Sequence, residues 1–274
     1  MSPSKTVILL LITGLSGCLM PRNNTSRATS TQGDIQNAPK YGYTPIDPLP
    51  VSLNFPADSS VFVNKDLLNA LPDETVRLAI GQFDAKGSLS FGPANAGVAG
   101  KNYVVVLDYI KFTTLPEKVR VSQSDSTGEK YFSVVSQQAD AQMIVPVYIG
   151  IGLRLTANVT VVQGNVDLGN LIALGIAAQT NKITGTLVVQ TLGISGEGIS
   201  ANIPMPSDIN QTSIQNAIQA LGSIKANIYN EKTLINPRVV GIYNNLGGGA
   251  VTVNRFISKV LEEPIKLNIT HRVF

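Results

Sequence analysis

Residues 145–161 read VPVYIGIGLRLTANVTV, and this stretch decides the fold. Every second residue from Val145 to Val161 is apolar, and the residues between them are mostly polar or glycine. Alternation with a period of two is typical of a β-strand that buries one face. Such a strand would extend over roughly 56 Å, which is long for a globular protein. We therefore expect a bend at Gly150 or Gly152.

The apolar face of this strand allows two interpretations. It can be a core strand of a sheet, or it can face lipid or a partner, because a membrane-crossing strand needs only about 9–11 residues with one apolar face. In the second case, several copies of the chain would each donate a hairpin formed by residues 145–161 and 183–194. The residues that would then contact the membrane or a partner are Val147, Ile149, Ile151, Leu153, Leu155 and Val159.

The flanking sequence predicts more strands than helices. An amphipathic helix is expected over residues 207–230, with Ser207 or Asp208 as its N-cap, and a short helix near residues 252–262. Residues 167–179 fit a strand and a helix capped by Asp167 equally well. Strands are predicted at residues 75–83, 103–112, 129–137, 183–194, 238–243 and 265–273. This order favours an α+β fold built mainly on an antiparallel or mixed β-sheet.

The N-terminus has the composition of an export signal. Lys5 precedes an apolar run that begins with VILLLI at residues 7–12, and LSGC follows at residues 15–18. The run is too short to cross a bilayer as a helix, which takes about 20 residues. It therefore predicts a signal peptide over residues 1–17.

The tetrapeptide LSGC resembles the lipobox of bacterial lipoproteins. The resemblance implies cleavage between Gly17 and Cys18 and attachment of lipid to the Cys18 thiol, so that acyl chains hold the mature protein at a membrane. It also implies contact with the lipoprotein-processing and sorting machinery. Leu19 follows the cysteine, where aspartate would favour retention at the inner membrane, so in a Gram-negative cell the resemblance implies the outer membrane.

The mature chain is expected to have two parts. Residues 18–59 are rich in Pro, Asn, Ser and Thr and predict a lipidated, flexible tether. Residues 60–274 predict a single β-rich folded domain. Cys18 is the only cysteine, so this domain has no intramolecular disulfide and depends on its apolar core for stability.

Signals for catalysis, for metal or cofactor binding and for nucleic-acid binding are weak. His271 is the only histidine, and alternation with Ile269 and Val273 suggests a residue on the face of a strand. One histidine and one lipidated cysteine do not make a zinc site. The net charge of +3, without a basic run, argues against a nucleic-acid partner.

The sequence therefore predicts a non-catalytic lipoprotein of the cell envelope. Its domain would bind a protein partner or form a homo-oligomer, in a secretion, pilus or transfer apparatus. The alternative is an oligomeric outer-membrane pore. The lipobox, the strand and turn LAIGQFDAKG at residues 78–87 and the long apolar hairpin are similar in a general way to lipoproteins of the curli-export channel type, which are built on that plan.

Overall fold

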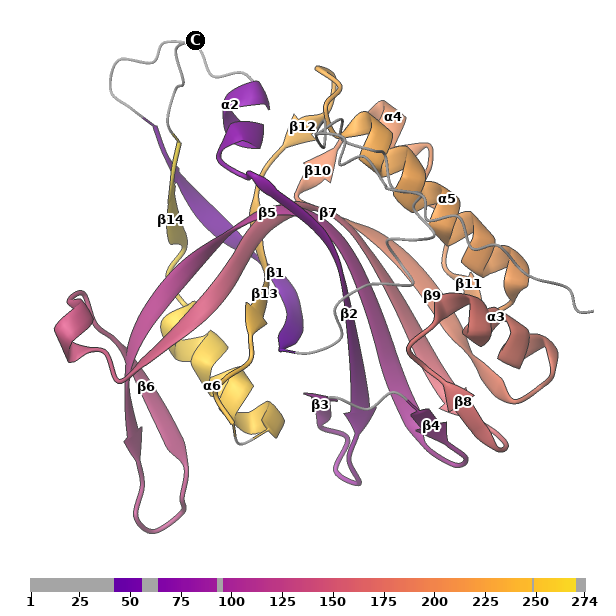
Figure 1. The fold of residues 1–274 in the computed structure, drawn as a ribbon, viewed down its shortest axis with the longest axis horizontal. Coiled ribbons are helices and arrows are strands. Elements are labelled where there is room, and N and C mark those ends of the chain that lie inside the picture. Colours follow the sequence, from indigo (N-terminus) through magenta and orange to yellow (C-terminus); the bar gives the residue numbers. More distant parts are fainter. Residues whose placement is uncertain (1–41, 56–63, 93–95, 248, 270–274) are drawn as a thin grey trace, which may run out of the picture.

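The computed structural model describes residues 42–55, 64–92, 96–247 and 249–269 (Figure 1). Ten strands form one mixed sheet, and two further pairs of short strands stand apart from it. The sheet strands are β1 (Tyr43–Asn54), β2 (Asp73–Phe83), β3 (Leu89–Gly92), β5 (Asn102–Gln123), β6 (Lys130–Val134), β7 (Met143–Val161), β9 (Ile183–Leu192), β11 (Ser207–Asp208), β13 (Arg238–Tyr243) and β14 (Ile265–Asn268). The short pairs are β4 (Ala96–Val98) with β8 (Asn165–Asp167), and β10 (Ile194–Ser195) with β12 (Leu234–Ile235).

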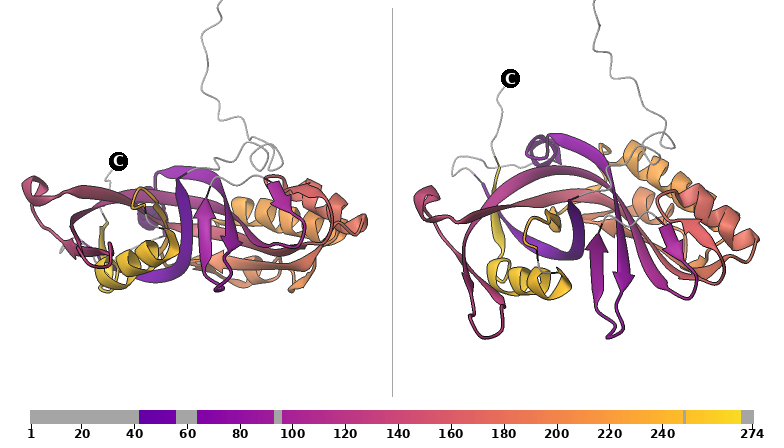
Figure 2. Two further views of the ribbon diagram at one scale, coloured as in Figure 1. Left: turned by 90° about the horizontal axis from the view of Figure 1, so that it is seen from below. Right: turned by 60° about the horizontal axis from the view of Figure 1, so that its bottom comes forward.

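The described residues form fewer helices than strands. The helices are α2 (Asn64–Asn69), α3 (Leu171–Gln179), α4 (Glu197–Ser200), α5 (Gln211–Asn227) and α6 (Gly249–Val260), with a 3-10 turn at Gln138–Asp140. Figures 1 and 2 show the pair α3 and α5 at one end of the molecule and α6 toward the other. The predicted α+β fold on a mainly antiparallel, mixed sheet is confirmed.

Strand β7 forms the centre of the sheet. Along one edge it pairs antiparallel with β5 from Met143 to Thr160. Its other edge is divided, because β13 pairs with the first half as far as Gly150 and β9 pairs with the second half from Gly152 onward. Gly152 lies at this change of partner, and a Cβ atom there would stand 1.9 Å from the carbonyl oxygen of Tyr109. Only glycine allows the two backbones to approach so closely.

The odd-numbered face of β7 carries the main core. Its side chains pack with those of β2 and β5 and with the inner faces of α3 and α5, including Leu174, Leu221 and Ile224. Asn210 begins α5 through a capping box with Ser213, in which each side chain accepts a hydrogen bond from the other residue's backbone N–H. The N-cap of this helix is therefore Asn210, and the predicted caps Ser207 and Asp208 form β11 instead.

The ambiguous stretch at residues 167–179 folds as helix α3. Its N-cap is Asn170, whose side chain accepts from the backbone N–H groups of Ile172 and Ala173. Asp167 belongs to β8 and accepts from the N–H of Gly169 in the turn before the helix.

The predicted boundary of the folded domain at residue 60 is wrong. Strand β1 lies within the sheet, antiparallel to β13 and parallel to β14. Prolines 45, 48 and 50 gave this segment the composition of a linker, although proline is compatible with a strand at a sheet edge or bulge. The pairing with β13 is irregular between Pro45 and Leu49.

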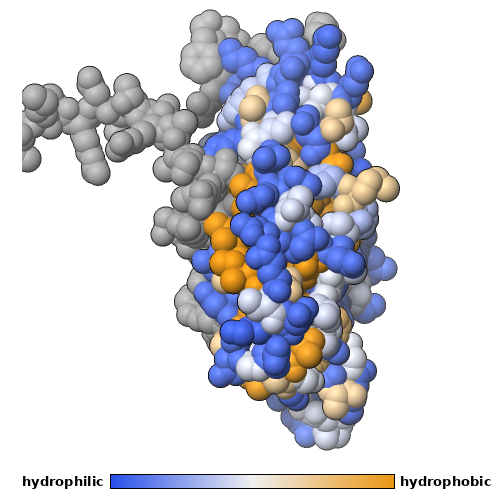
Figure 3. Space-filling view, turned by 90° about the vertical axis from the view of Figure 1, so that its right-hand side faces the viewer, coloured by the Kyte–Doolittle hydropathy of each residue, from blue (hydrophilic) through white to orange (hydrophobic). Residues whose placement is uncertain are grey.

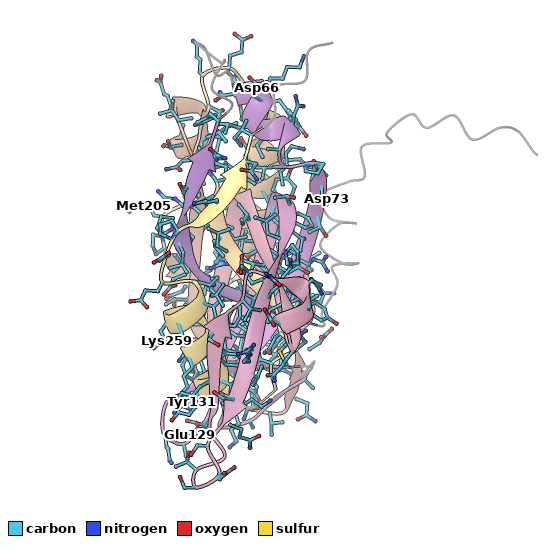
Figure 4. All side chains as sticks on the ribbon, turned by 90° about the vertical axis from the view of Figure 1, so that its left-hand side faces the viewer. Asp66, Asp73, Glu129, Tyr131, Met205 and Lys259 are labelled. Carbon is cyan, nitrogen blue, oxygen red and sulfur yellow. The ribbon has the colours of Figure 1, made fainter. Side chains whose placement is uncertain are left out.

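Helix α6 packs beside the finger formed by β6 and the end of β5. The rings of Phe256 and Phe132 meet edge to face at 5.7 Å, and Arg255 forms an ion pair with Glu129 at 2.6 Å. Figure 4 shows Glu129 and Tyr131 at one end of the molecule and Asp66 of α2 at the opposite end.

Candidate functional site

The even-numbered face of β5 and β7 carries a buried ion pair. Asp108 and Arg154 are cross-strand partners in the register of the two strands. Arg154 Nε donates to Asp108 Oδ1 at 2.7 Å, and Nη2 donates to Oδ2 at 2.6 Å. Both side chains are buried. The fork-to-fork geometry is the strongest arrangement that an arginine and a carboxylate can adopt.

The remaining polar atoms of this pair connect it to two other strands. Arg154 Nη1 donates to the carbonyl of Ile46 at 2.6 Å, and Nη2 donates to the carbonyl of Val240 at 2.8 Å. The hydroxyl of Tyr43 donates to Asp108 Oδ2 at 2.5 Å. We call Tyr43, Asp108 and Arg154 the charge cluster. Its hydrogen bonds link β1 and β13 to β5 and β7.

The surroundings of the charge cluster favour the protonated forms of Tyr43 and Arg154. Burial raises the pKa of the Tyr43 hydroxyl well above its ordinary value, and the Asp108 carboxylate raises it further. For Arg154, burial opposes the charge, but the Asp108 carboxylate outweighs burial and raises the pKa. A hydroxyl and a guanidinium that hold their protons so firmly serve as hydrogen-bond donors at neutral pH, which is a structural role.

A groove of about 800 Å³ is lined by residues of β1, β3, β5, β7, β9 and α6, among them Arg154 of the charge cluster. We call it the β1–β3 groove. Its apolar lining includes Ile46, Leu49, Leu89, Phe91, Val104, Val106, Val188, Val253 and Ile257. Its polar lining includes Thr44, Ser88, Ser90, Thr156, Gln190, Asn244 and Asn254.

The β1–β3 groove has little charge to offer a ligand. Asp47 and Arg154 are the charged residues of its lining, and the hydrogen-bonding groups of Arg154 are engaged by Asp108 and two carbonyls. Asp47 is exposed. Apolar walls with hydroxyl and amide groups between them suit a neutral ligand, which would gain from burial and from a small number of directed hydrogen bonds.

One border of the groove is a free sheet edge. Strand β3 ends the order of the sheet and, among the described strands, pairs only with β2. Its residues Leu89, Ser90 and Phe91 line the groove. An unpaired edge offers backbone N–H and C=O groups to an added strand. Strand β1 on the opposite border is less suited to this pairing, because its prolines lack N–H groups.

The structure places the predicted membrane or partner residues inside the core. Val147, Ile149, Ile151 and Leu153 have no exposed surface, and Leu155 and Val159 are 1 % and 2 % exposed. Helix α5 and the other core elements cover this face of β7. In this conformation these side chains are not available to lipid or to a partner, which argues for the core-strand interpretation.

The candidate residues for cleavage and lipidation, and the histidine near the C-terminus, lie outside the described residues. These are Gly17 and Cys18 of the lipobox and His271 near the C-terminus. Within the described ranges, no group of three or more His, Cys, Asp or Glu is placed to hold a metal ion, and no helix is long and apolar enough to cross a membrane.

The charge cluster and the groove were missed by sequence reasoning. A signal for the cluster was present, since Arg154 is the single charge of residues 145–161 and Asp108 is the single charge of the apolar run at residues 103–110. Ions in such positions are rarely buried without a partner. The groove had no comparable signal, because its walls come from segments that lie far apart in the sequence.

Comparison with known proteins identifies no relative. No protein-family model matches the chain, and no curated protein and no solved structure matches it significantly.

Proposed function

We propose that this chain is a lipid-anchored protein of the bacterial cell envelope whose domain binds an extended, neutral segment of a partner protein in the β1–β3 groove. Binding is non-catalytic and serves assembly, in a secretion, pilus or transfer apparatus. The anchor is supported by the LSGC motif at residues 15–18. The observation that carries the binding role is the groove itself, bordered by the free edge of β3.

An extended peptide fits this site better than a compact small molecule. The edge of β3 offers main-chain hydrogen bonds, and alternate side chains of an added strand would point into the groove and away from it. Apolar side chains pointing inward would meet Phe91, Val106 and Val188, while Thr156 and Gln190 offer polar contacts. Asp47 is the one charge of the lining that the charge cluster does not engage, so the groove offers little to compensate the desolvation of a strongly charged segment.

The test is selection from a displayed library of ten-residue peptides against the detergent-extracted protein. Peptides with alternating apolar and uncharged polar residues are expected to be enriched. Thr156→Trp fills the groove and is expected to weaken binding of these peptides at least tenfold. Asn158→Trp is the matched control, because Asn158 lies two residues along the same face of β7, is exposed, and does not line the groove.

Two results would contradict the proposal. Selection might enrich no peptide above background, in which case the groove is not a peptide site. Equal binding to wild type and to Thr156→Trp would show that enriched peptides bind elsewhere on the surface.

A further inference from the structure

Helix α3 presents apolar residues on the outside as well as on the inside. Its sequence is LIALGIAAQ, and Leu171, Leu174 and Ala177 are buried against the sheet. On the outward side Ile176 is 53 % exposed. Figure 3 faces this end of the molecule and shows hydrophobic residues that interrupt a hydrophilic surface. A surface helix normally has polar residues on its outer face, so this face of α3 is unusual.

A second hollow lies beside Ile176, between α3 and α5. Its volume is about 520 Å³, and its lining includes Ile172, Gly175, Gln215 and Ile218. The helices approach closely at its floor, where a Cβ atom on Gly175 would lie 3.2 Å from the Cα of Gln211. We call Ile176 and this hollow the α3–α5 face. It shares no lining residue with the β1–β3 groove.

The sequence that forms the α3–α5 face is free of charge. Residues 168–181 and 209–224 contain no Asp, Glu, Lys or Arg. The outward positions of α5 carry amide side chains instead, among them Gln211, Gln215 and Gln219. Gln179 of α3 donates to Gln211 at 2.9 Å across the two helices. Charge depletion of this kind is characteristic of the buried centre of a protein interface.

We propose that the α3–α5 face binds the same face of a second copy of this chain. In a two-fold contact each patch must complement itself, so it needs a projection and a hollow side by side. Ile176 is the projection, and the hollow beside it is lined by Ile172 and Ile218. Two uncharged faces also meet without like-charge repulsion, whereas a strongly charged partner would find no opposite charge here.

The same composition disfavours a lipid surface as the occupant. Helices that lie on membranes usually carry Lys or Arg along the polar face and aromatic residues at the interface. On α5 the basic residue is Lys225, in the last turn, and it forms an ion pair with Glu74 at 3.4 Å. Helix α3 has neither a basic nor an aromatic residue.

The test is light scattering after gel filtration of the full, detergent-extracted protein over a range of concentrations. Wild type is expected to show twice the monomer protein mass at high concentration and to dissociate on dilution. Ile176→Lys is expected to raise the dissociation constant at least tenfold. Val251→Lys is the matched control, because Val251 is an apolar helix residue with 56 % exposure on α6, at a distance from the face.

Three outcomes would overturn the proposal. Wild type that stays monomeric at tens of micromolar has no such interface. Association that survives Ile176→Lys comes from another surface or from shared micelles. If Ile176→Lys and Val251→Lys weaken the association equally, and circular dichroism shows that both variants are folded, a general change of surface charge is responsible.

Discussion

Asp108 and Arg154 face each other across β5 and β7 and are joined by two hydrogen bonds, and Arg154 also lines the β1–β3 groove. Replacing either side chain leaves the charge of the other buried without a counter-charge. Asp108→Ala is therefore expected to lower the free energy of unfolding by about 3–5 kcal/mol, measured by urea denaturation.

The double variant Asp108→Leu/Arg154→Met separates a paired role from two independent ones. It should be clearly more stable than the sum of the single losses predicts, because no isolated charge remains. Simple additivity of the two single variants would contradict the pairing.

The second prediction concerns alkaline pH. Burial and the Asp108 carboxylate raise the pKa of Tyr43 above the ordinary 10.0, so above pH 10 the unfolded chain releases a proton that the folded protein retains. The protonated Tyr43 hydroxyl therefore contributes fully to the free energy of unfolding below pH 10. Above pH 10 this contribution declines by up to about 1.4 kcal/mol per pH unit. The stability difference between wild type and Tyr43→Phe should shrink between pH 9 and 11. A stability difference that stays constant between pH 9 and 11 would contradict the raised pKa of Tyr43.

The third prediction tests the close approach of strands at Gly152. Gly152→Ala forces a methyl group against the carbonyl oxygen of Tyr109, and we expect a loss of at least about 2–3 kcal/mol. Gly92 has no atom within 4 Å of its would-be Cβ atom, so Gly92→Ala should change the stability by less than about 0.5 kcal/mol. Thermal and urea unfolding of both variants provide the comparison. Similar values for the two would mean that the backbones can separate at Gly152 without cost.

The fourth prediction locates the start of α5. Asn210→Ala removes the acceptor for the N–H of Ser213 and should cost about 1 kcal/mol, whereas Asn210→Asp should retain most of the cap. Asp208→Ala should have a smaller effect, because Asp208 lies before the capping residue. A larger loss for Asp208→Ala than for Asn210→Ala would move the helix start to the earlier position.

The fifth prediction concerns the anchor. Cys18→Ala removes the thiol to which the lipobox resemblance assigns the lipid, so the variant should incorporate no labelled fatty acid and should remain uncleaved or leave the membrane fraction. Ser16→Ala keeps a small residue before the cysteine and should be processed normally. Acylation or ordinary membrane fractionation of Cys18→Ala would contradict the lipobox interpretation.

Local patterns predicted the elements that depend on local burial. The alternation at residues 145–161 matches β7, and the helical spacing at residues 207–230 contains α5. The stretch at residues 167–179 could not be decided from periodicity, because α3 is apolar on nearly all sides and both templates fit it. Packing against α5 favours the helix over the strand in this stretch.

Long-range pairing accounts for the remaining differences. Strand β5 runs to Gln123, well past the apolar stretch that ends at Phe112, because its polar second half pairs with the first half of β7. Strand β1 was taken for part of a tether, and only its partners β13 and β14 make it a strand. The groove depends on these same distant contacts, so no short motif could reveal it.

The division of one edge of β7 between β13 and β9 has a consequence for how the protein opens. Strands β13 and β9 are both hydrogen-bonded to β7, so the part of the sheet around β13 and the part around β9 share this strand. If either part detached from β7, apolar side chains that pack against the other part would be exposed. The domain should therefore behave as one cooperative unit in native-state hydrogen exchange, with the amides of β9 and β13 exchanging only through global unfolding. Tension applied through an N-terminal anchor would enter this unit at β1, where the charge cluster binds it to the two central strands.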